Sequence, residues 1–358
     1  MERLGLVGLP NAGKTSLFNA LTGAAAPVAP HAFTTTESAM AVAPLPDPRL
    51  DSLAEMSASK KVVHAGMEVV DIAGLVPGAS TGEGLGNRFL AGIREVDALC
   101  LVLRAFESDE APGDCDPVEA LGGLELELVL ADVGTVEAQI DKRRKAARQD
   151  KSLLAQVAAM ETALEILSGG VPLYRSGIDA ETAAALHDLF LLTVKPVLAV
   201  VNLGEDQLEK SDSLVGPVAE ALGGHGEALG VSVQLEAETA QMAPEERTEI
   251  LDALGLGEGA LPRVARGAYQ LLGRRTFLTT GDKESRAWSF RAGATAPECA
   301  GVIHSDLQRG FIRAEIIHWD ELLDCGSWAK AKAAGKIRLE GKEYHVDDGD
   351  VLEIRFNV

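Results

Sequence analysis

Residues 8–16 read Gly-Leu-Pro-Asn-Ala-Gly-Lys-Thr-Ser and fit the phosphate-binding pattern G-x-x-x-x-G-K-[ST]. The apolar residues 4–7 before this stretch predict a buried strand, and apolar residues from Leu17 onward predict a helix after it. Its glycines let backbone N–H groups turn toward phosphate oxygens, and the helix N-terminus adds partial positive charge. An ordinary glycine-rich turn is the alternative, but the complete spacing with Lys-Thr favours a nucleoside triphosphate site.

The positions of this loop have distinct expected roles. Lys14 is expected to reach the β- and γ-phosphates and to act in catalysis, the Thr15 hydroxyl to bind Mg²⁺, and Ser16 to donate toward the α-phosphate. The other loop residues expected to contact the nucleotide are Pro10, Asn11, Ala12 and Gly13.

Three later stretches extend the expected hydrolase site. Residues 67–72 predict a strand that ends in Asp71-Ile72-Ala73-Gly74, which places Asp71 in the magnesium shell and the Gly74 N–H near the γ-phosphate. The threonine-rich residues 33–37 lie where nucleotide-sensing switches occur, although a plain loop is the alternative there. The glycine-dense residues 78–87 predict a second, mobile switch.

The strand predicted at residues 196–201 ends in Asn202-Leu203-Gly204-Glu205. Guanine-binding P-loop proteins carry Asn-Lys-x-Asp at this point, and the aspartate accepts hydrogen bonds from guanine. Here Leu203 replaces the lysine and Glu205 the aspartate, which weakens guanine recognition and favours ATP. Asn202, Leu203 and Glu205 are therefore the expected base-binding residues, and one more short strand is predicted at residues 231–233.

The hydrophobic periodicity divides the chain into three predicted parts. Residues 1–116 and 191–274 are expected to form an α/β P-loop domain with a doubly wound, mostly parallel sheet. Two long apolar stripes predict an inserted antiparallel helical hairpin, residues 117–190. Residues 275–358 predict a small α+β domain of β-grasp type. Its strands are expected at 275–279, 287–290, 311–317, 344–346 and 351–356, with a short helix after 295–297.

The charge balance restricts the partners of the chain. Its 358 residues include 33 basic and 54 acidic ones, a formal charge of -21. This argues against charge-driven binding to DNA or an anionic membrane, so an RNA or ribosome contact would need a locally basic face. The most basic stretch is Lys142-Arg143-Arg144-Lys145 at the turn of the predicted hairpin, and Arg309 and Arg313 add to it from the C-terminal domain. A solvated helix face is the alternative for the turn.

The cysteines and the apolar runs indicate a cytoplasmic protein, which we expect to be a monomer. Cys100, Cys115, Cys299 and Cys325 form no C-x-x-C pair and predict free thiols in a reducing compartment. The first apolar run stops at Pro10, too early for a signal peptide, and the longest later run is interrupted by Lys195-Pro196.

Over nearly its whole length the chain resembles the YchF family, the Obg-like ATPases. The most specific stretches are residues 8–16, 46–50, 71–76, 82–87, 202–205, 310–315 and 348–351. The resemblance implies a P-loop domain, a coiled-coil insertion and a C-terminal TGS domain of β-grasp fold. It also implies Mg²⁺-dependent ATP hydrolysis in preference to GTP, association with ribosomes and a link to stress responses. Thr35 takes the place of the family's switch threonine, as magnesium ligand and catalytic residue beside Lys14 and Gly74.

Several positions depart from the family pattern. Residues 32–39 differ around Thr35, residues 106–117 lack the histidine that many members carry, and residues 234–237 replace the usual small residues. Leu75 stands where Ras-type GTPases place a water-orienting glutamine, so slow turnover is expected, with a partner or a K⁺ ion held by Asn11 as candidate activator. Two alternatives stay open: an Obg-type GTPase, and a ribosome- or RNA-binding module whose nucleotide site sets domain positions.

Overall fold

The computed structural model describes residues 2–24, 26, 39–74, 85–107, 115–254 and 256–357. The chain forms two compact units, one of Met1–Ala43 with Glu68–Leu272 and one of Pro44–Met67 with Gly273–Val358. Residues 44–67 were expected in the P-loop domain, yet they group with the C-terminal strands. The helical insertion, expected as a separate domain, groups with the P-loop strands.

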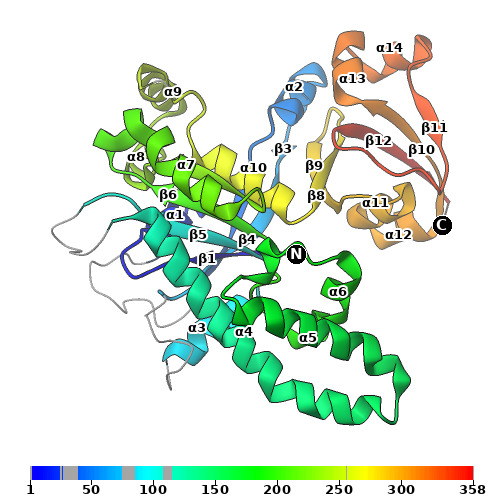
Figure 1. Cartoon of the computed structure of the whole chain (residues 1–358). Coiled ribbons are helices and arrows are strands. Elements are labelled where there is room, and N and C mark those ends of the chain that lie inside the picture. Colours follow the sequence, from blue (N-terminus) through cyan, green and yellow to red (C-terminus); the bar gives the residue numbers. More distant parts are fainter. Residues whose placement is uncertain are drawn as a thin grey trace. The chain divides into compact units, whose positions relative to one another are not determined.

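The first unit is built on a sheet with the strand order β2-β4-β1-β5-β6-β7 (Figure 1). The strands are β1 (Arg3–Val7), β2 (Ala39–Leu45), β4 (Ala65–Asp71), β5 (Ala98–Arg104), β6 (Val197–Asn202) and β7 (Gly226–Val231). The pairs β1–β4, β1–β5, β5–β6 and β6–β7 are all parallel. Parallel neighbours need crossover connections, and helices supply them here. The predicted doubly wound, mostly parallel sheet is confirmed.

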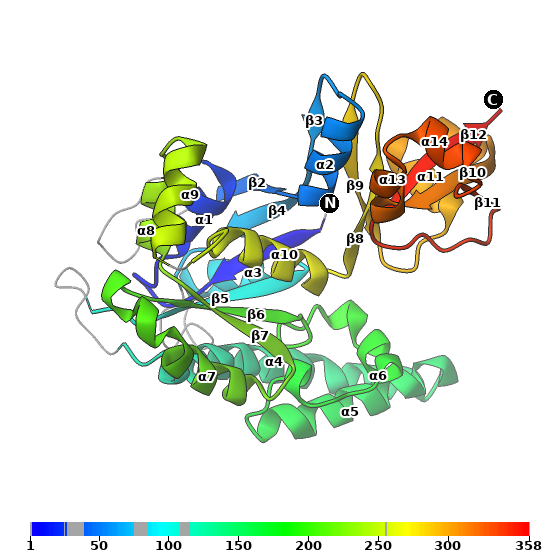
Figure 2. The ribbon, with the colours of Figure 1, turned by 90° about the horizontal axis from the view of Figure 1, so that it is seen from above.

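Helices pack on both faces of this sheet. Helices α1 (Lys14–Thr22) and α10 (Leu261–Leu271) contact one face, and α4 (Pro117–Ala147) and α7 (Ser211–Leu222) contact the other (Figure 2). Buried aliphatic side chains of β5 and β6 meet those of α4 and α7 in one hydrophobic cluster. The remaining helices of the unit include α3 (Leu85–Arg94), α5 (Leu154–Ser168), α6 (Ala180–Ala185), α8 (Val233–Thr239) and α9 (Pro244–Ala253).

The strand expected at residues 231–233 was predicted wrongly. β7 pairs with β6 residue by residue until Val231 faces Asn202, which is the last residue of β6. Beyond that point the ladder has no further partner, and Ser232 becomes the residue that precedes α8.

The helical insertion is a hairpin, as predicted. α4 and α5 lie side by side and bury Val136, Ile140, Met160 and Leu167 between them in a cluster separate from that of the sheet (Figure 1). The returning chain is held by the buried carboxylate of Asp132, which accepts hydrogen bonds from both backbone N–H groups of residues 192 and 193, at 2.9 and 2.8 Å. The insertion therefore has its own core and a fixed point of return to the sheet.

The second unit has the strand order β11-β10-β12-β8-β9-β3. Its strands are β3 (Val62–Val63), β8 (Arg274–Thr279), β9 (Ser285–Arg291), β10 (Phe311–His318), β11 (Arg338–Glu340) and β12 (Asp350–Phe356). Its helices are α2 (Pro48–Met56), α11 (Ala296–Ile303), α12 (Ser305–Arg309), α13 (Trp319–Cys325) and α14 (Trp328–Ala333).

Strands β12 and β8 are parallel neighbours, while β9 pairs antiparallel with β8 and β10 antiparallel with β12. α11 packs on Phe277 and Phe290 of this sheet. A helix packed on a mixed sheet, with antiparallel pairs on either side of a central parallel pair, is the predicted β-grasp arrangement. The strand expected at residues 344–346 is absent from the described structure, where His345 makes one isolated bridge to Thr295. Both sides of β12 are already paired, with β8 and β10, so residues 344–346 have no place beside it.

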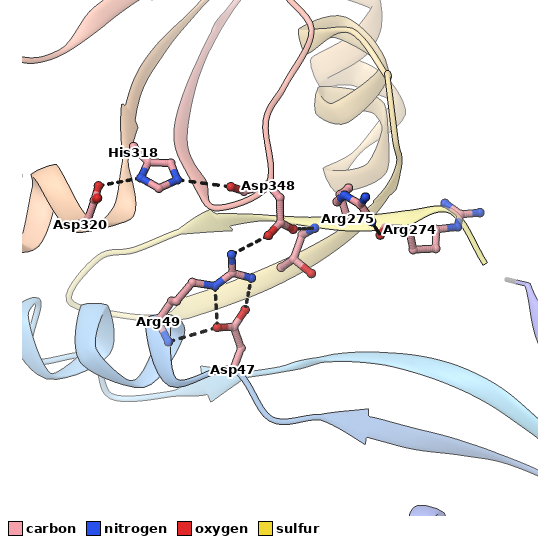
Figure 3. A network of polar contacts seen from close by, with 8 residues as sticks. Asp47, Arg49, Arg274, Arg275, His318, Asp320 and Asp348 are labelled. Atoms are coloured by element: carbon pink, nitrogen blue, oxygen red, sulfur yellow. Dashed lines mark hydrogen bonds and ion pairs between the residues drawn. The ribbon is translucent and has the colours of Figure 1, made fainter. Parts of the chain in front are cut away.

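Two motifs of the sequence, residues 46–50 and 348–351, meet in the second unit (Figure 3). The Arg49 guanidinium lies 2.7 Å from Asp348 Oδ2 and 2.8 Å from Asp47 Oδ2. The other Asp348 oxygen accepts a hydrogen bond from the Thr276 N–H of β8 at 2.8 Å. Arg49 thus ties the start of α2 to the turn before β12, which is consistent with the grouping of residues 44–67 in this unit.

Candidate nucleotide site

The phosphate loop passes close to two neighbouring elements. Asn11 and Gly13 both have positive φ values, 60° and 94°, so the loop uses left-handed backbone at two positions. A Cβ added at Gly8 would lie 2.5 Å from the Val102 carbonyl oxygen of β5, and one added at Gly13 would collide with the side-chain amide of Asn202. Glycine is therefore required at both positions for steric reasons, as the sequence pattern predicted.

Lys14 is the first residue of α1, and its side chain folds back under the loop. It is 7% exposed, and its ammonium donates to the Leu9 carbonyl oxygen at 2.9 Å. Burial lowers the pKa of Lys14 to about 8, and the nearby Asp71 charge partly opposes this. A Cβ at Gly74 would lie 3.2 Å from the Lys14 Nζ and 3.3 Å from Pro10. The structure thus brings Lys14, Gly74 and the loop together.

Asp71 ends β4 beside the start of α1, as predicted. The Thr15 hydroxyl donates to Asp71 Oδ2 at 2.7 Å, while Asp71 Oδ1 is buried without a hydrogen-bond partner among the described residues. Burial raises the pKa of Asp71, against the opposing effects of the Thr15 hydrogen bond and the Lys14 charge. A bare carboxylate oxygen next to a hydroxyl oxygen is a donor set that suits Mg²⁺. The third predicted ligand, Thr35, lies outside the described residues.

Asn202 connects the end of β6 to two other parts of the site. Its side-chain N–H donates to the Ala12 carbonyl oxygen at 3.0 Å, and its side-chain oxygen accepts from the Val233 N–H at 3.2 Å. The side chain is 4% exposed, so both contacts are shielded from water. Asn202 therefore supports the phosphate loop and the start of α8.

The two other residues of this motif differ in environment. The Leu203 side chain is 2% exposed and packs in the hydrophobic cluster of the sheet, so only its main chain is left to meet a base. Glu205 is exposed at the first position of a 3₁₀ helix, Glu205–Lys210. Their expected contacts with a base stay predictions.

Comparisons with known proteins agree along the whole chain. The model of the 50S ribosome-binding GTPase family matches residues 3–130, and the YchF-GTPase C-terminal model, described as a protein of unknown function, matches residues 275–357. A Bacillus subtilis protein named ribosome-binding ATPase YchF is 44% identical over 361 residues, 99% of both chains. The chain belongs to the YchF family. An Escherichia coli O157:H7 protein of the same name is also 44% identical, with 99% of both chains covered.

A solved member of the YchF family shares the whole architecture. The structure of the Schizosaccharomyces pombe YchF GTPase matches with a TM-score of 0.86 and 32% sequence identity, over 99% of this chain and 97% of that chain. The α/β domain with its helical insertion and the β-grasp domain are thus the family fold.

One residue of this YchF site was not singled out by the sequence. Ser232 is 3% exposed, and its hydroxyl has no hydrogen-bond partner among the described residues. It lies between Val231, which faces Asn202 across the ladder, and Val233, which donates to Asn202. A serine between a strand and a helix is a weak signal in a sequence because such residues commonly cap helices.

The lowered pKa of Lys14 makes a prediction for nucleotide binding. Phosphate oxygens stabilise the ammonium, so its pKa must be higher in the bound protein than in the free one. Below about pH 8 Lys14 is charged in the free protein and in the nucleotide-bound protein. In that range the titration of Lys14 is expected not to change the Kd for ATP with Mg²⁺ as the pH varies. Above it, binding requires proton uptake, and the Kd should rise toward about tenfold per pH unit.

Calorimetric titrations at about pH 7 and about pH 9, each in two buffers of different ionisation enthalpy, measure both the Kd and the proton uptake. Uptake that appears only at the higher pH is expected. An equal Kd at both pH values, with no uptake, would contradict the assignment of Lys14 as the phosphate cation.

Proposed function

We propose that this YchF-family protein is a Mg²⁺-dependent ATPase that binds ribosomes in the cytoplasm. The observation that carries the proposal is the group formed by buried Lys14 and Asp71 with the Thr15 hydroxyl, next to a complete phosphate loop. It is supported by the names of the Bacillus subtilis and Escherichia coli relatives, which are ribosome-binding ATPases. No helix among the described residues is long and apolar enough to cross a membrane.

Each residue of the site has a different role in ATP binding and hydrolysis. The Lys14 ammonium exchanges its contact with the Leu9 carbonyl for phosphate oxygens, and loop N–H groups cradle the remaining ones. Thr15 and Asp71 would hold Mg²⁺, which when bound neutralises charge on the phosphates. Gly74 lies next to Lys14, and we expect its N–H to serve the same phosphate.

The residue after Gly74 is not one that can orient the attacking water. Leu75 follows Gly74, and an aliphatic side chain cannot hydrogen-bond an attacking water. We therefore expect slow intrinsic turnover, raised by a partner or by K⁺ held at Asn11. Phosphate release measured with ATP and with GTP, with and without ribosomes and K⁺, tests the function as a whole. An ATPase that ribosomes stimulate fits the proposal, a GTP preference favours the Obg-type alternative, and binding without any hydrolysis favours the ribosome-binding module.

ATP is expected to bind more tightly than GTP. Glu205 is longer than the aspartate that reads guanine, and Leu203 buries its side chain in the core where guanine-binding proteins have a lysine. In a thermal-shift titration with Mg²⁺, equal concentrations of nucleotide should stabilise the protein more with ATP. A larger shift with GTP would refute the preference, and Glu205→Asp is the matched variant that should narrow the difference.

The turn of the helical hairpin is a candidate ribosome contact. Arg144 is engaged by Glu161 at 2.9 Å and by Asp141 at 3.2 Å, which neutralises part of the basic stretch. Replacing Arg143 and Arg144 with glutamate should weaken ribosome co-sedimentation at low salt and leave ATP affinity unchanged. If co-sedimentation survives this charge reversal, the turn is a solvated helix face.

A further inference from the structure

The negative charge of the chain is concentrated in one of its two units. The first unit carries 17 basic and 37 acidic residues, a formal charge of −20, whereas the second carries 16 basic and 17 acidic ones. The net charge of the first unit repels a polyanion such as RNA, whereas the nearly neutral second unit repels it very little. The second unit is therefore where a contact with RNA is least costly.

One corner of the second unit's sheet brings two arginines next to each other. Arg313 of β10 and Arg355 of β12 are direct partners in the antiparallel register. Their neighbours Ala314 and Ile354, also partners, point to the hydrophobic core, so both arginines lie on the opposite face of the sheet. Arg355 is paired with the carboxylates of Glu315 and Glu353, at 3.3 and 3.1 Å, which compensates much of its charge. Arg313 is exposed and makes no ion pair with any described residue, so its charge has no carboxylate partner there.

A buried glutamate organises this corner. Glu315 follows on the same face of β10, is 4% exposed, and accepts from Lys332 of α14 at 3.0 Å and from Arg355 at 3.3 Å. The Lys332 hydrogen bond, followed by those from Arg355, holds the pKa of Glu315 below its usual range. The Lys332 and Arg355 heads stay about half exposed, at 57% and 43%. They are thus fixed in place while part of each remains open to a ligand.

We propose that Arg313, Arg355 and Lys332 form a phosphate-binding corner that docks the backbone of ribosomal RNA. The proposal rests on the proposed ribosome binding and names a second surface for it, in addition to the turn of the helical hairpin. Arginine forks match phosphate oxygens, and a bound phosphate would give Arg313 the anionic partner that it lacks among the described residues. The apolar side chains of Ile312 on β10 and Leu339 on β11 are 56% and 60% exposed, and they offer contact to ribose and base. These two strands are neighbours at the edge of the sheet (Figure 1).

The test uses the full chain with Arg313→Gln and Arg355→Gln combined. Lys342→Gln is the matched control, because Lys342 is an exposed cation in a turn of the same unit. Ribosome co-sedimentation at low salt should weaken by about tenfold in the double variant and stay unchanged in the control. For a labelled polyuridine strand, the log–log slope of affinity against salt should fall by about 1.4, since each lost single-strand phosphate contact removes about 0.7. ATP affinity should be the same in all proteins.

The outcomes separate this inference from the proposed function. If the unmodified chain does not co-sediment with ribosomes, the proposed ribosome binding fails. If the unmodified chain binds ribosomes and the double variant binds them equally well, the corner is overturned while the function stands. If ribosome binding weakens but polyuridine binding and its salt slope do not change, the corner docks a ribosomal protein and the assignment to RNA is wrong. Arg313→Gln alone, which removes no ion pair among the described residues, repeats the test should the double variant not fold.

Discussion

Replacing Lys14 with alanine is expected to raise the Kd for ATP with Mg²⁺ by at least about a hundredfold. Lys14 is the buried cation of the phosphate loop, and a charge-assisted hydrogen bond contributes about 1.5–3 kcal/mol, more where water is excluded. The variant also leaves Asp71 beside the phosphates without its neighbouring positive charge. Both effects act against a polyanionic ligand in the same direction. Isothermal titration calorimetry with a non-hydrolysable ATP analogue measures the change.

The free protein should tolerate the Lys14 substitution. Its ammonium is held out of water and makes one hydrogen bond among the described residues, to the Leu9 carbonyl oxygen, so removing it also removes a desolvation cost. Unfolding of the free variant should therefore occur close to that of the unmodified chain. Lys142→Ala, at the exposed end of α4, is the control for loss of one lysine. If Lys14→Ala binds ATP within about threefold of the unmodified chain, Lys14 is not the cation that binds the phosphates.

The sequence was sufficient for the parts of the fold that rest on local patterns. The strand, glycine loop and helix at residues 3–22, the carboxylate at the end of β4 and the two helices of the insertion each carry their own periodicity or spacing. The Lys14, Thr15 and Asp71 group could be predicted for the same reason. Parallel strands bring their carboxyl ends to one edge of a sheet, so order along the chain determined which residues would meet.

The sequence failed where distant segments decide the structure. The segment between β2 and β4 leaves the P-loop sheet because Arg49 binds Asp348, 299 positions later, and β3 pairs with β9. No local pattern contains that information. Residues 344–346 have a strand-like composition, but only His345 pairs, in one isolated bridge to Thr295. Residues 231–233 extend past the end of β6. Tertiary pairing overrode local preference at both places.

The role of Asn202 is a similar case. Its place in an Asn-x-x-Glu motif indicates contact with a base, and this inference needs only the residue types in the sequence. Its contacts with the Ala12 carbonyl and the Val233 N–H depend on how β6, the phosphate loop and α8 pack together. The geometry therefore adds a supporting role that does not require nucleotide, and the two roles make different predictions.

Asn202→Ala is expected to lower the free energy of unfolding of the nucleotide-free protein by about 2–4 kcal/mol. The substitution leaves the Ala12 carbonyl and the Val233 N–H without their partner at a site where the side chain is 4% exposed. Urea denaturation followed by circular dichroism, in the absence of nucleotide, measures the change. Affinity for ATP and for GTP should fall together, because the loop that holds the phosphates loses its support.

Two matched variants separate support from base recognition. Asn202→Asp keeps an acceptor for the Val233 N–H but turns a carboxylate toward the Ala12 carbonyl, so it should be at least as destabilising as alanine. Glu205→Ala, at an exposed position, should leave stability unchanged and alter only the ratio of ATP to GTP affinity. A residue that only reads the base would behave in the opposite way to our expectation for Asn202: its loss would change that ratio and spare the free protein. Unchanged stability in Asn202→Ala would therefore show that the two hydrogen bonds do not hold the loop.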